Sequence, residues 1–396
     1  MRILVSILFS LFLMATPSVA QEKAHYDHKD ADVKDKPIKE LKEELADINP
    51  SNLEEAITSF NAAKKSEDSH RLTFYAEHLY LFVEKELSIN ERAKIAMLWL
   101  EYYTLHSDGH KSPEKPYLNT LSLLKRNEDK NHEILSNMYL AIGNFYLKQV
   151  EKNYSRMQEV YFNKASKSYN RLIKLTKEYT PKNKAILAAI HIEIGKNYYF
   201  AGDGYEALKH LKIGQNIYAA HTEQYPEQLA TAEFWIAKVR LARGKYKKAE
   251  IAMIKALNIL EKTNPNSQLA LSGHAFMIQI LEKQGRREEA TKHAQIIGAS
   301  RPFRPDQEQI PLYRVPSIYP SNASRRGLGG WVMVEYTIDK HGFVKNSKAN
   351  HGENLKYFKD AAVAAVEKYR FAPRYEDGKP VSTDNLTIIL SYEMKK

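Results

Sequence analysis

Cysteine is missing from all 396 residues. Disulfide crosslinks, thiolate nucleophiles and thiolate metal sites are therefore excluded, and a chain of this length relies on its hydrophobic core. Gly-x-x-x-x-Gly-Lys-Ser/Thr loops, Gly-x-Ser-x-Gly elbows and His-Glu-x-x-His helices are missing too. We therefore predict that the protein is not an enzyme and has no catalytic residues, no cofactor and no bound metal. A hydrolase or metal enzyme is the alternative, and it would need converging polar side chains in one cleft.

Long apolar runs are missing except at the start, where residues 3–14 are apolar apart from two serines. A basic start, this short apolar stretch and the small residues Ser18 and Ala20 are typical of a secretory signal. We therefore predict a signal peptide at 1–20, cleaved before Gln21, and a periplasmic location. The alternative is an uncleaved anchor in the inner membrane, facing the periplasm, but a span needs about 20 apolar residues.

Charged residues are abundant but not concentrated: they make up 27% of the chain, and the formal net charge is +11. Basic residues are interleaved with acidic ones, which together with export argues against nucleic acid as a partner. Residues 21–40 have no apolar period, and a flexible charged leader is predicted at 21–49. His25, Asp27, His28 and Asp30 have the chemistry of metal ligands, but no rigid scaffold holds them, so no metal site is assigned.

Residues 50–300 are predicted to be helical and to contain an internal repeat. An apolar helix, a turn with glycine and a second helix recur, with turns at Gly202, Gly244 and Gly285. The second helices share a small residue at spacings of 42, 42 and 41 residues: Ala165, Ala207, Ala249 and Ala290. Because a small side chain at a fixed period lets two helices touch, the pattern predicts stacked helical hairpins.

With Gly195 and Tyr198 ahead of Ala207, the pattern resembles the tetratricopeptide repeat. An earlier copy opens at Gly143, but its Ala165 comes late, as expected if its helices are longer. The resemblance implies a concave face that binds a peptide or a partner protein. The residues predicted to line this repeat groove are Asn144, Lys196, Tyr199, Lys238 and Leu241. The two lysines could meet a carboxylate of the partner, or simply face solvent.

The helical pattern ends at residues 301–312, where prolines predict a linker. The remaining residues, 313–396, are predicted to form a separate domain with the alternation typical of strands.

Apolar and polar side chains alternate over residues 331–339, a tight turn ends at Gly342, and residues 343–349 return as a second strand. A helix with one apolar stripe over residues 358–369 follows. Residues 384–394 alternate again and are predicted to be the last strand. The expected arrangement is ββαβ, with one helix packed on three strands.

Short motifs are distributed along this domain in a fixed order: Tyr319-Pro320, Ala323, Gly327, Gly330-x-Val332, Asp339-x-x-Gly342, Tyr369-Arg370-Phe371-x-Pro373 and Asp377-Gly378-Lys379-Pro380-Val381. Together they resemble the C-terminal domain of TonB energy transducers, over about residues 311–394. The expected fold class is thus α+β multidomain: an all-α tetratricopeptide-like solenoid followed by a small ββαβ TonB-C-terminal-like domain. The resemblance implies a binding module whose partners are an outer-membrane TonB-dependent transporter or other TonB-system proteins.

In the family, a transporter segment called the TonB box adds to the last strand of the sheet as a further strand, so the resemblance places the peptide there. The residues expected to bind it are Asn385, Thr387, Ile389, Ser391 and Glu393 on the last strand, with Arg314 and Tyr319 in the segment that enters the domain. If this edge closes a homodimer instead, the same residues pair with a second copy.

Transducers of the family carry an N-terminal membrane helix and a proline-rich spacer, whereas this chain has a short signal-like stretch and repeats. The favoured hypothesis is a periplasmic adaptor of a TonB-type transport system, whose repeats dock a partner and whose C-terminal domain binds a peptide strand. The alternative is a membrane-anchored divergent transducer that drives outer-membrane receptor transport.

Overall fold

A computed structural model of the chain describes residues 53–65, 69–86, 88–105, 112–152, 157–300 and 309–393. The predicted signal peptide at 1–20 and the leader at 21–49, with His25, Asp27, His28 and Asp30, lie outside the described residues, as does most of the predicted linker. The chain divides into two compact units, with the boundary between Lys182 and Asn183. This boundary falls inside the predicted helical region, so the later helices share a unit with the C-terminal sheet.

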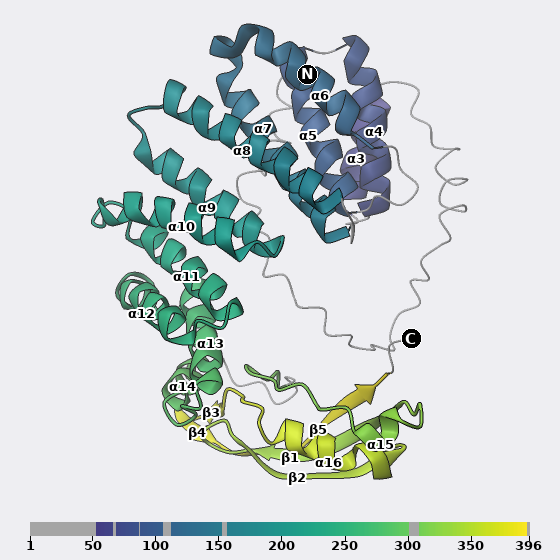
Figure 1. The fold of residues 1–396 in the computed structure, drawn as a ribbon, viewed down its shortest axis with the longest axis vertical. Helices are drawn as coiled ribbons and strands as arrows, with labels where there is room; N and C mark the ends of the chain where they lie inside the picture. The colour runs from purple at the N-terminus through teal and green to yellow at the C-terminus, as the bar shows by residue number, and fades with distance from the viewer. Residues whose placement is uncertain are drawn as a thin grey trace. The chain divides into compact units, whose positions relative to one another are not determined.

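The described residues of the first unit form helices (Figure 1). Their bounds are α3 Leu53–Lys65, α4 Ser69–Glu86, α5 Ile89–Leu105, α6 Glu114–Leu124, the 3-10 turn η1 Lys125–Asn127, α7 Glu128–Lys152 and α8 Met157–Tyr179. Helices α7 and α8 have 25 and 23 residues, whereas α9 and α10 of the next pair have 17 and 16. The prediction that longer helices delay Ala165 is therefore confirmed.

The second unit begins with stacked helix pairs. Their bounds are α9 Lys184–Phe200, α10 Gly204–Ala219, α11 Pro226–Ala242, α12 Tyr246–Thr263, α13 Gln268–Lys283 and α14 Thr291–Ala299. Gly202, Gly244 and Gly285 form the turns within the pairs, each with a positive φ, of 85°, 68° and 75°. Glycine adopts this conformation without the steric cost that a side chain would bring, so the predicted turns are confirmed.

The helices approach one another where the sequence places small residues. Ala207, Ala249 and Ala290 are fully buried. A Cβ added to Gly195 of α9 would lie 2.6 Å from Cγ of Leu211 in α10. A larger residue at either kind of position would push the paired helices apart, which explains why the repeat keeps them small.

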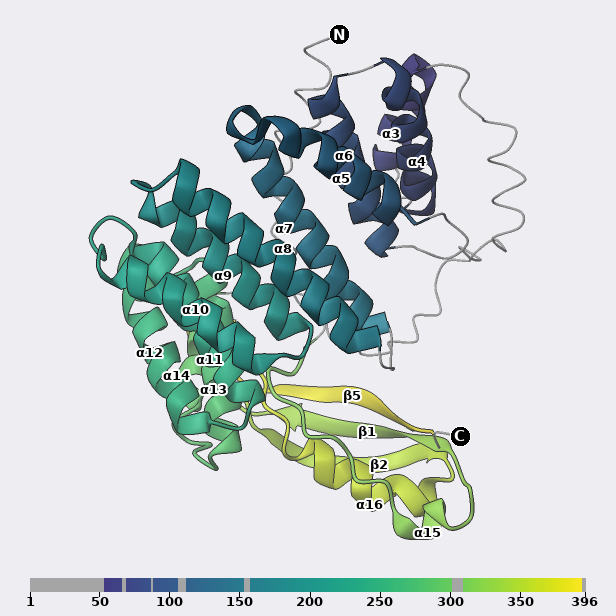
Figure 2. The same cartoon turned by 45° about the horizontal axis from the view of Figure 1, so that its top comes forward.

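The C-terminal domain follows in the same unit. Its elements are α15 Ser321–Ser324, β1 Gly330–Ile338, β2 Val344–Glu353, α16 Leu355–Val366, β3 Arg374–Glu376, β4 Lys379–Val381 and β5 Thr383–Tyr392. Strands β2, β1 and β5 form one antiparallel sheet in that order, and α16 runs beside it (Figure 2). The predicted ββαβ arrangement is confirmed.

Two details differ from the expectation. The segment before the last strand, which was not predicted to contain strands, forms a two-stranded ribbon, in which β3 and β4 are joined at Asp377 and Gly378, with φ values of 51° and 74°. Positive φ at both central residues is the geometry of a tight type I′ hairpin. Strand β2 is also longer than predicted and continues to Glu353.

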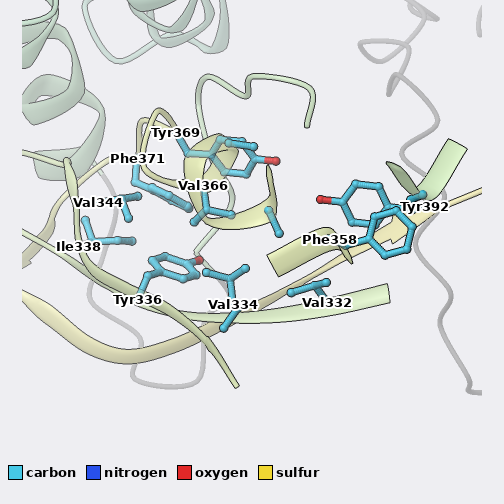
Figure 3. Packing of buried hydrophobic residues seen from close by; sticks show 14 residues of the cluster. Val332, Val334, Tyr336, Ile338, Val344, Phe358, Val366, Tyr369, Phe371 and Tyr392 are labelled. Carbon is cyan, nitrogen blue, oxygen red and sulfur yellow. The ribbon is translucent and has the colours of Figure 1, made fainter. Parts of the chain in front are cut away.

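The core of the domain lies between the sheet and α16. Val334 and Tyr336 of β1 point toward Val366 of α16 (Figure 3). At the other end of the helix, Phe358 stacks on Tyr392 of β5 with ring centroids 4.2 Å apart. Apolar side chains alternate along β1, because every second residue of a strand faces the same side. Burying one such side chain stabilises the fold by roughly 1.5–3 kcal/mol.

Two pairs of buried histidines recur in the helix stack. Nδ1 of His191 lies 2.9 Å from Nδ1 of His210, and Nδ1 of His274 lies 2.8 Å from Nδ1 of His293. One ring of each pair has to donate and the other has to accept, so the two Nδ1 atoms of a pair cannot both carry a proton. The helix pair between them has Ala252 at the position of the second histidine.

The buried histidines predict acid sensitivity. Burial lowers the pKa of His210 to about 4 and that of His293 to about 3, below the value of about 6.5 in an unfolded chain. The unfolded chain therefore binds protons that the folded chain does not. Stability is full above about pH 6.5 and falls as the pH decreases, by at most about 1.4 kcal/mol per pH unit for each histidine. Urea unfolding between about pH 7.5 and 4.5 measures this slope.

A double variant, His210→Ala with His293→Ala, copies the alanine that the middle pair already has at this position. We expect its stability to fall less steeply on the acid side than that of the parent protein. Equal slopes in the two proteins would contradict the assignment.

Candidate functional site

The position of β1 determines which sheet edges stay open. Strand β1 pairs with β2 on one side and with β5 on the other. Among the described residues, neither β2 nor β5 has a second partner in this sheet. Both outer strands therefore have one side on which backbone N–H and C=O groups meet no neighbouring strand.

Strand β5 is a regular edge. From Leu386 to Tyr392 it keeps a continuous register with β1. Leu386, Ile388 and Leu390 are half-buried against the core, whereas the alternate residues are exposed, and Ile389 is 60% exposed. Neither proline, lysine nor glycine occurs in the strand, and these are the residues that commonly protect an edge against pairing.

Strand β2 is a protected edge. Its register with β1 shifts at two places, which indicates bulges. Asn346 has a positive φ of 52°, and Lys345 and Lys348 are exposed on the strand. Nζ of Lys348 forms an ion pair with Glu335 of β1 at 3.1 Å. Because bulges and lysines oppose the addition of a further strand, β5 is the edge that suits a peptide.

The predicted β5 residues divide into two groups. Thr387, Ile389 and Ser391 lie exposed on the regular part of the strand. Asn385 has a positive φ of 57° and lies where the register shifts, and Glu393 follows the end of the strand. The regular ladder that a peptide could extend therefore runs from Leu386 to Tyr392.

Arg314 and Tyr319 lie toward different ends of β5. The residue next to Arg314, Tyr313, forms a bridge with Arg370, which also bridges Phe343 beside the β1–β2 turn. Tyr319 packs its ring at 6.0 Å from that of Tyr392, at the end of β5. Tyr319 is part of the domain core, where its hydroxyl donates to the Leu328 carbonyl. The two residues do not form one cluster with the exposed face of β5.

Three of the five predicted groove residues come together in the second unit. The ammonium of Lys238 lies 4.3 Å from the ring centroid of Trp235 and 5.4 Å from that of Tyr199. Lys196 lies 5.7 Å from the same tryptophan ring and forms an ion pair with Glu193 at 2.7 Å. We call Lys196, Tyr199, Trp235 and Lys238 the lysine–tryptophan cluster.

The two other predicted groove residues lie apart from these contacts. Asn144 belongs to α7 in the first unit, where its Oδ1 accepts a hydrogen bond from Tyr169 of α8 at 2.8 Å. Leu241 is half-buried in α11, three residues after Lys238. Trp235 and Phe276 were not among the predicted groove residues, and Phe276 lies 5.0 Å from the Lys238 ammonium. Phe276 lies 42 residues after Phe234, so the repeat spacing was a signal for Phe276 but not for Trp235.

The described residues contain no group of three or more metal-ligating side chains. No helix in the described ranges has the length and the apolar character needed to cross a membrane.

Residues 315–394 match a family model described as the Gram-negative bacterial TonB protein C-terminal. The chain therefore contains a TonB C-terminal domain, as the motifs predicted, and stacked helical repeats precede it. No curated protein matches the chain. One solved structure, titled "Crystal structure of BtubC (BKLC) from P. vanneervenii", aligns with 13% identity and a TM-score of 0.37, covering 66% of this chain and 95% of that chain.

Neighbouring isoleucines of β5 test the orientation of the strand. Ile388 faces the core, whereas Ile389 is exposed. We expect Ile388→Thr to lower the free energy of unfolding by about 1–2 kcal/mol and Ile389→Thr to change it by less than about 0.5 kcal/mol. Urea unfolding of both variants provides the comparison. A larger loss for Ile389→Thr would mean that the strand is turned by one residue.

Proposed function

We propose that this chain, which carries a TonB C-terminal domain, is a periplasmic interaction protein of a TonB-type transport system. In this proposal β5 binds an extended peptide by strand addition, and the repeats dock a second partner. The observation that carries the proposal is the regular open edge of β5. Such domains belong to proteins of the Gram-negative envelope, which supports a site of action between the two membranes.

Strand addition uses backbone groups that the fold leaves unpaired. Between Leu386 and Tyr392, alternate residues direct N–H and C=O groups away from β1, because successive residues of a strand point to opposite sides. A peptide laid along this edge would form several backbone hydrogen bonds, each with a net value of about 1 kcal/mol. An edge of this kind binds a range of sequences and leaves selectivity to the side chains.

The side chains of β5 indicate which peptide fits. On the core side the peptide would continue the half-buried row of Leu386, Ile388 and Leu390. On the other side it would lie beside Thr387, Ile389 and Ser391, where only Ile389 is apolar. We therefore expect a peptide with apolar residues at alternate positions, such as the TonB box of an outer-membrane TonB-dependent transporter.

The lysine–tryptophan cluster is the proposed contact of the repeats. Trp235 is half-buried, and the ammonium groups of Lys196 and Lys238 lie over its ring. An acidic side chain of a partner could replace Glu193 in the ion pair with Lys196. Asn144 is left out of this proposal because its side chain is bonded to Tyr169.

The second candidate function is that of a membrane-anchored transducer, in which residues 1–20 stay attached and the chain pulls on outer-membrane receptors. The apolar stretch at residues 3–14 is the feature that favours it. Mass spectrometry of the mature protein separates the two: Gln21 as the first residue supports the adaptor, and an intact Met1 supports the transducer.

A pair of proline variants tests strand addition. Thr387 and Ile388 are neighbours, so one of their N–H groups faces β1 and the other faces the open edge. We expect one of the variants, Thr387→Pro or Ile388→Pro, to destabilise the domain. The other should stay folded and bind a fluorescein-labelled TonB-box peptide about tenfold more weakly or worse, since it loses one outward donor. Fluorescence anisotropy measures the binding.

The matched control is applied to the peptide. N-methylation at every second residue removes the donors of one side of the strand, so one methylated phase should abolish binding and the other should retain it. If the folded proline variant binds as the parent does, or if both methylated peptides bind equally, β5 is not the site. If a second copy of the chain occupies β5, sedimentation will show a dimer that the peptide dissociates.

A further inference from the structure

The C-terminal domain is seated on the last helix pair through a buried charged cluster. The side chain of Arg370 has 0% exposure, and its Nη2 donates a hydrogen bond to Oγ1 of Thr291 in α14 at 2.7 Å. Its Nε lies 3.5 Å from Oε1 of Glu282 in α13, whose side chain is 3% exposed. Nε of Arg287 donates to Oε2 of the same carboxylate at 3.0 Å. We call Glu282, Arg287 and Arg370 the charged cluster.

The charged cluster is only partly satisfied. One carboxylate faces two guanidinium groups; Glu282 and Arg370 are buried, whereas the Arg287 side chain is 37% exposed. Nε and Nη1 of Arg370, Nη2 of Arg287 and Oε1 of Glu282 are buried without a hydrogen-bond partner. The ring of Phe343 lies 3.5 Å from the Arg370 guanidinium, and it compensates part of that charge. Buried polar atoms without hydrogen-bond partners destabilise the docked state, because water would bond to the same atoms if the contact opened.

Burial disfavours the charged form of both Arg370 and Glu282. It lowers the pKa of Arg370 to about 10, and the charge of Glu282 does not restore the usual value. It raises the pKa of Glu282, although the charges of Arg287 and Arg370 oppose the change. Buried ion pairs often fail to recover their desolvation cost, and they fix geometry more than they add stability.

The domain has a core of its own that does not depend on this contact. The buried cluster of the domain consists only of residues from Ala323 to Tyr392. Against α14 the domain contributes a close backbone approach, because a Cβ added to Gly298 would lie 2.3 Å from the Pro373 carbonyl oxygen. A contact that includes incompletely hydrogen-bonded charged groups and lies beside a separate core resembles the interfaces between domains that move relative to each other.

We propose that the C-terminal domain is detachable: the charged cluster holds it on α13 and α14 in one defined orientation, and it opens without unfolding either part. Opening hydrates Glu282, Arg287 and Arg370 and leaves the core of the domain intact. A force applied to the C-terminal domain would therefore separate it from α13 and α14 before the domain unfolds. This inference concerns the domain contact alone and does not rest on peptide binding at β5.

Gly298→Ala is a steric wedge that tests the proposal. The new methyl group would meet the Pro373 carbonyl, whereas alanine within a helix is otherwise favourable. Since the chain has no cysteine, Lys292→Cys on α14 and Lys359→Cys on α16, both at exposed positions, provide unique spin-label sites. Double electron–electron resonance then measures the distance between the two labels.

We expect two distances in the parent protein, a docked one and a longer one. Gly298→Ala should lower the docked-to-open ratio at least tenfold while circular dichroism and amide protection in β1 stay unchanged. Ile296→Ala, an exposed residue of the same helix, is the matched control and should leave the ratio as it is. A single docked distance in Gly298→Ala, or release that occurs only with loss of the sheet, would overturn the proposal.

An apolar replacement of the charged cluster tests the same proposal in the opposite direction. The triple variant Glu282→Leu, Arg287→Leu, Arg370→Met removes the desolvation cost while keeping similar volume. We expect its docked-to-open ratio to rise at least tenfold. A fall in that ratio would show that the charged cluster stabilises docking by more than its desolvation costs, and it would contradict a cluster that fixes the orientation without adding stability.

Discussion

The pairing of β1 on both of its sides is the constraint on which the C-terminal domain depends. A strand has two hydrogen-bonding sides, and β1 uses them for β2 and β5. Three strands under one helix cannot close into a barrel, so two edges remain. Bulges and lysines protect β2, whereas β5 stays regular over seven positions from Leu386 to Tyr392. The topology of the sheet therefore leaves two open edges, and the residues of β5 make it the edge that is not protected against a further strand.

The helix pairs depend on small residues at the places where two helices meet. Small residues such as Ala207 and Gly195 allow the pairs to approach closely, and the turn glycines reverse the chain within each pair. Gly298 extends this principle to the last helix, where the partner is the backbone of the C-terminal domain instead of another helix. The stack thus ends at α14, whose Gly298 and Thr291 contact the C-terminal domain.

Much of the fold was predictable because it follows from local pattern. Alternation over residues 331–339 and 384–394 predicted β1 and β5, Gly342 predicted the turn between the first two strands, and the spaced alanines predicted the helix pairs. The ribbon of β3 and β4 was missed, since strands of three residues are too short to show alternation.

Side-chain contacts between residues far apart in the sequence could not be predicted. Arg370 stood out only as part of a motif, because Glu282 and Thr291 lie in helices before the domain. Lys196 and Lys238 were expected on one face, but the tryptophan between them comes from a repeat position with no fixed residue type. Asn144 was assigned to the same groove, although its amide is bonded within the first unit.

The most direct test of the account is amide hydrogen exchange of β5, followed residue by residue with and without a TonB-box peptide. The account predicts that alternate amides between Leu386 and Tyr392 exchange quickly in the free protein and become protected when the peptide is present, while β2 does not change. Uniform protection of β5 in the free protein, or protection that appears on β2, would contradict it.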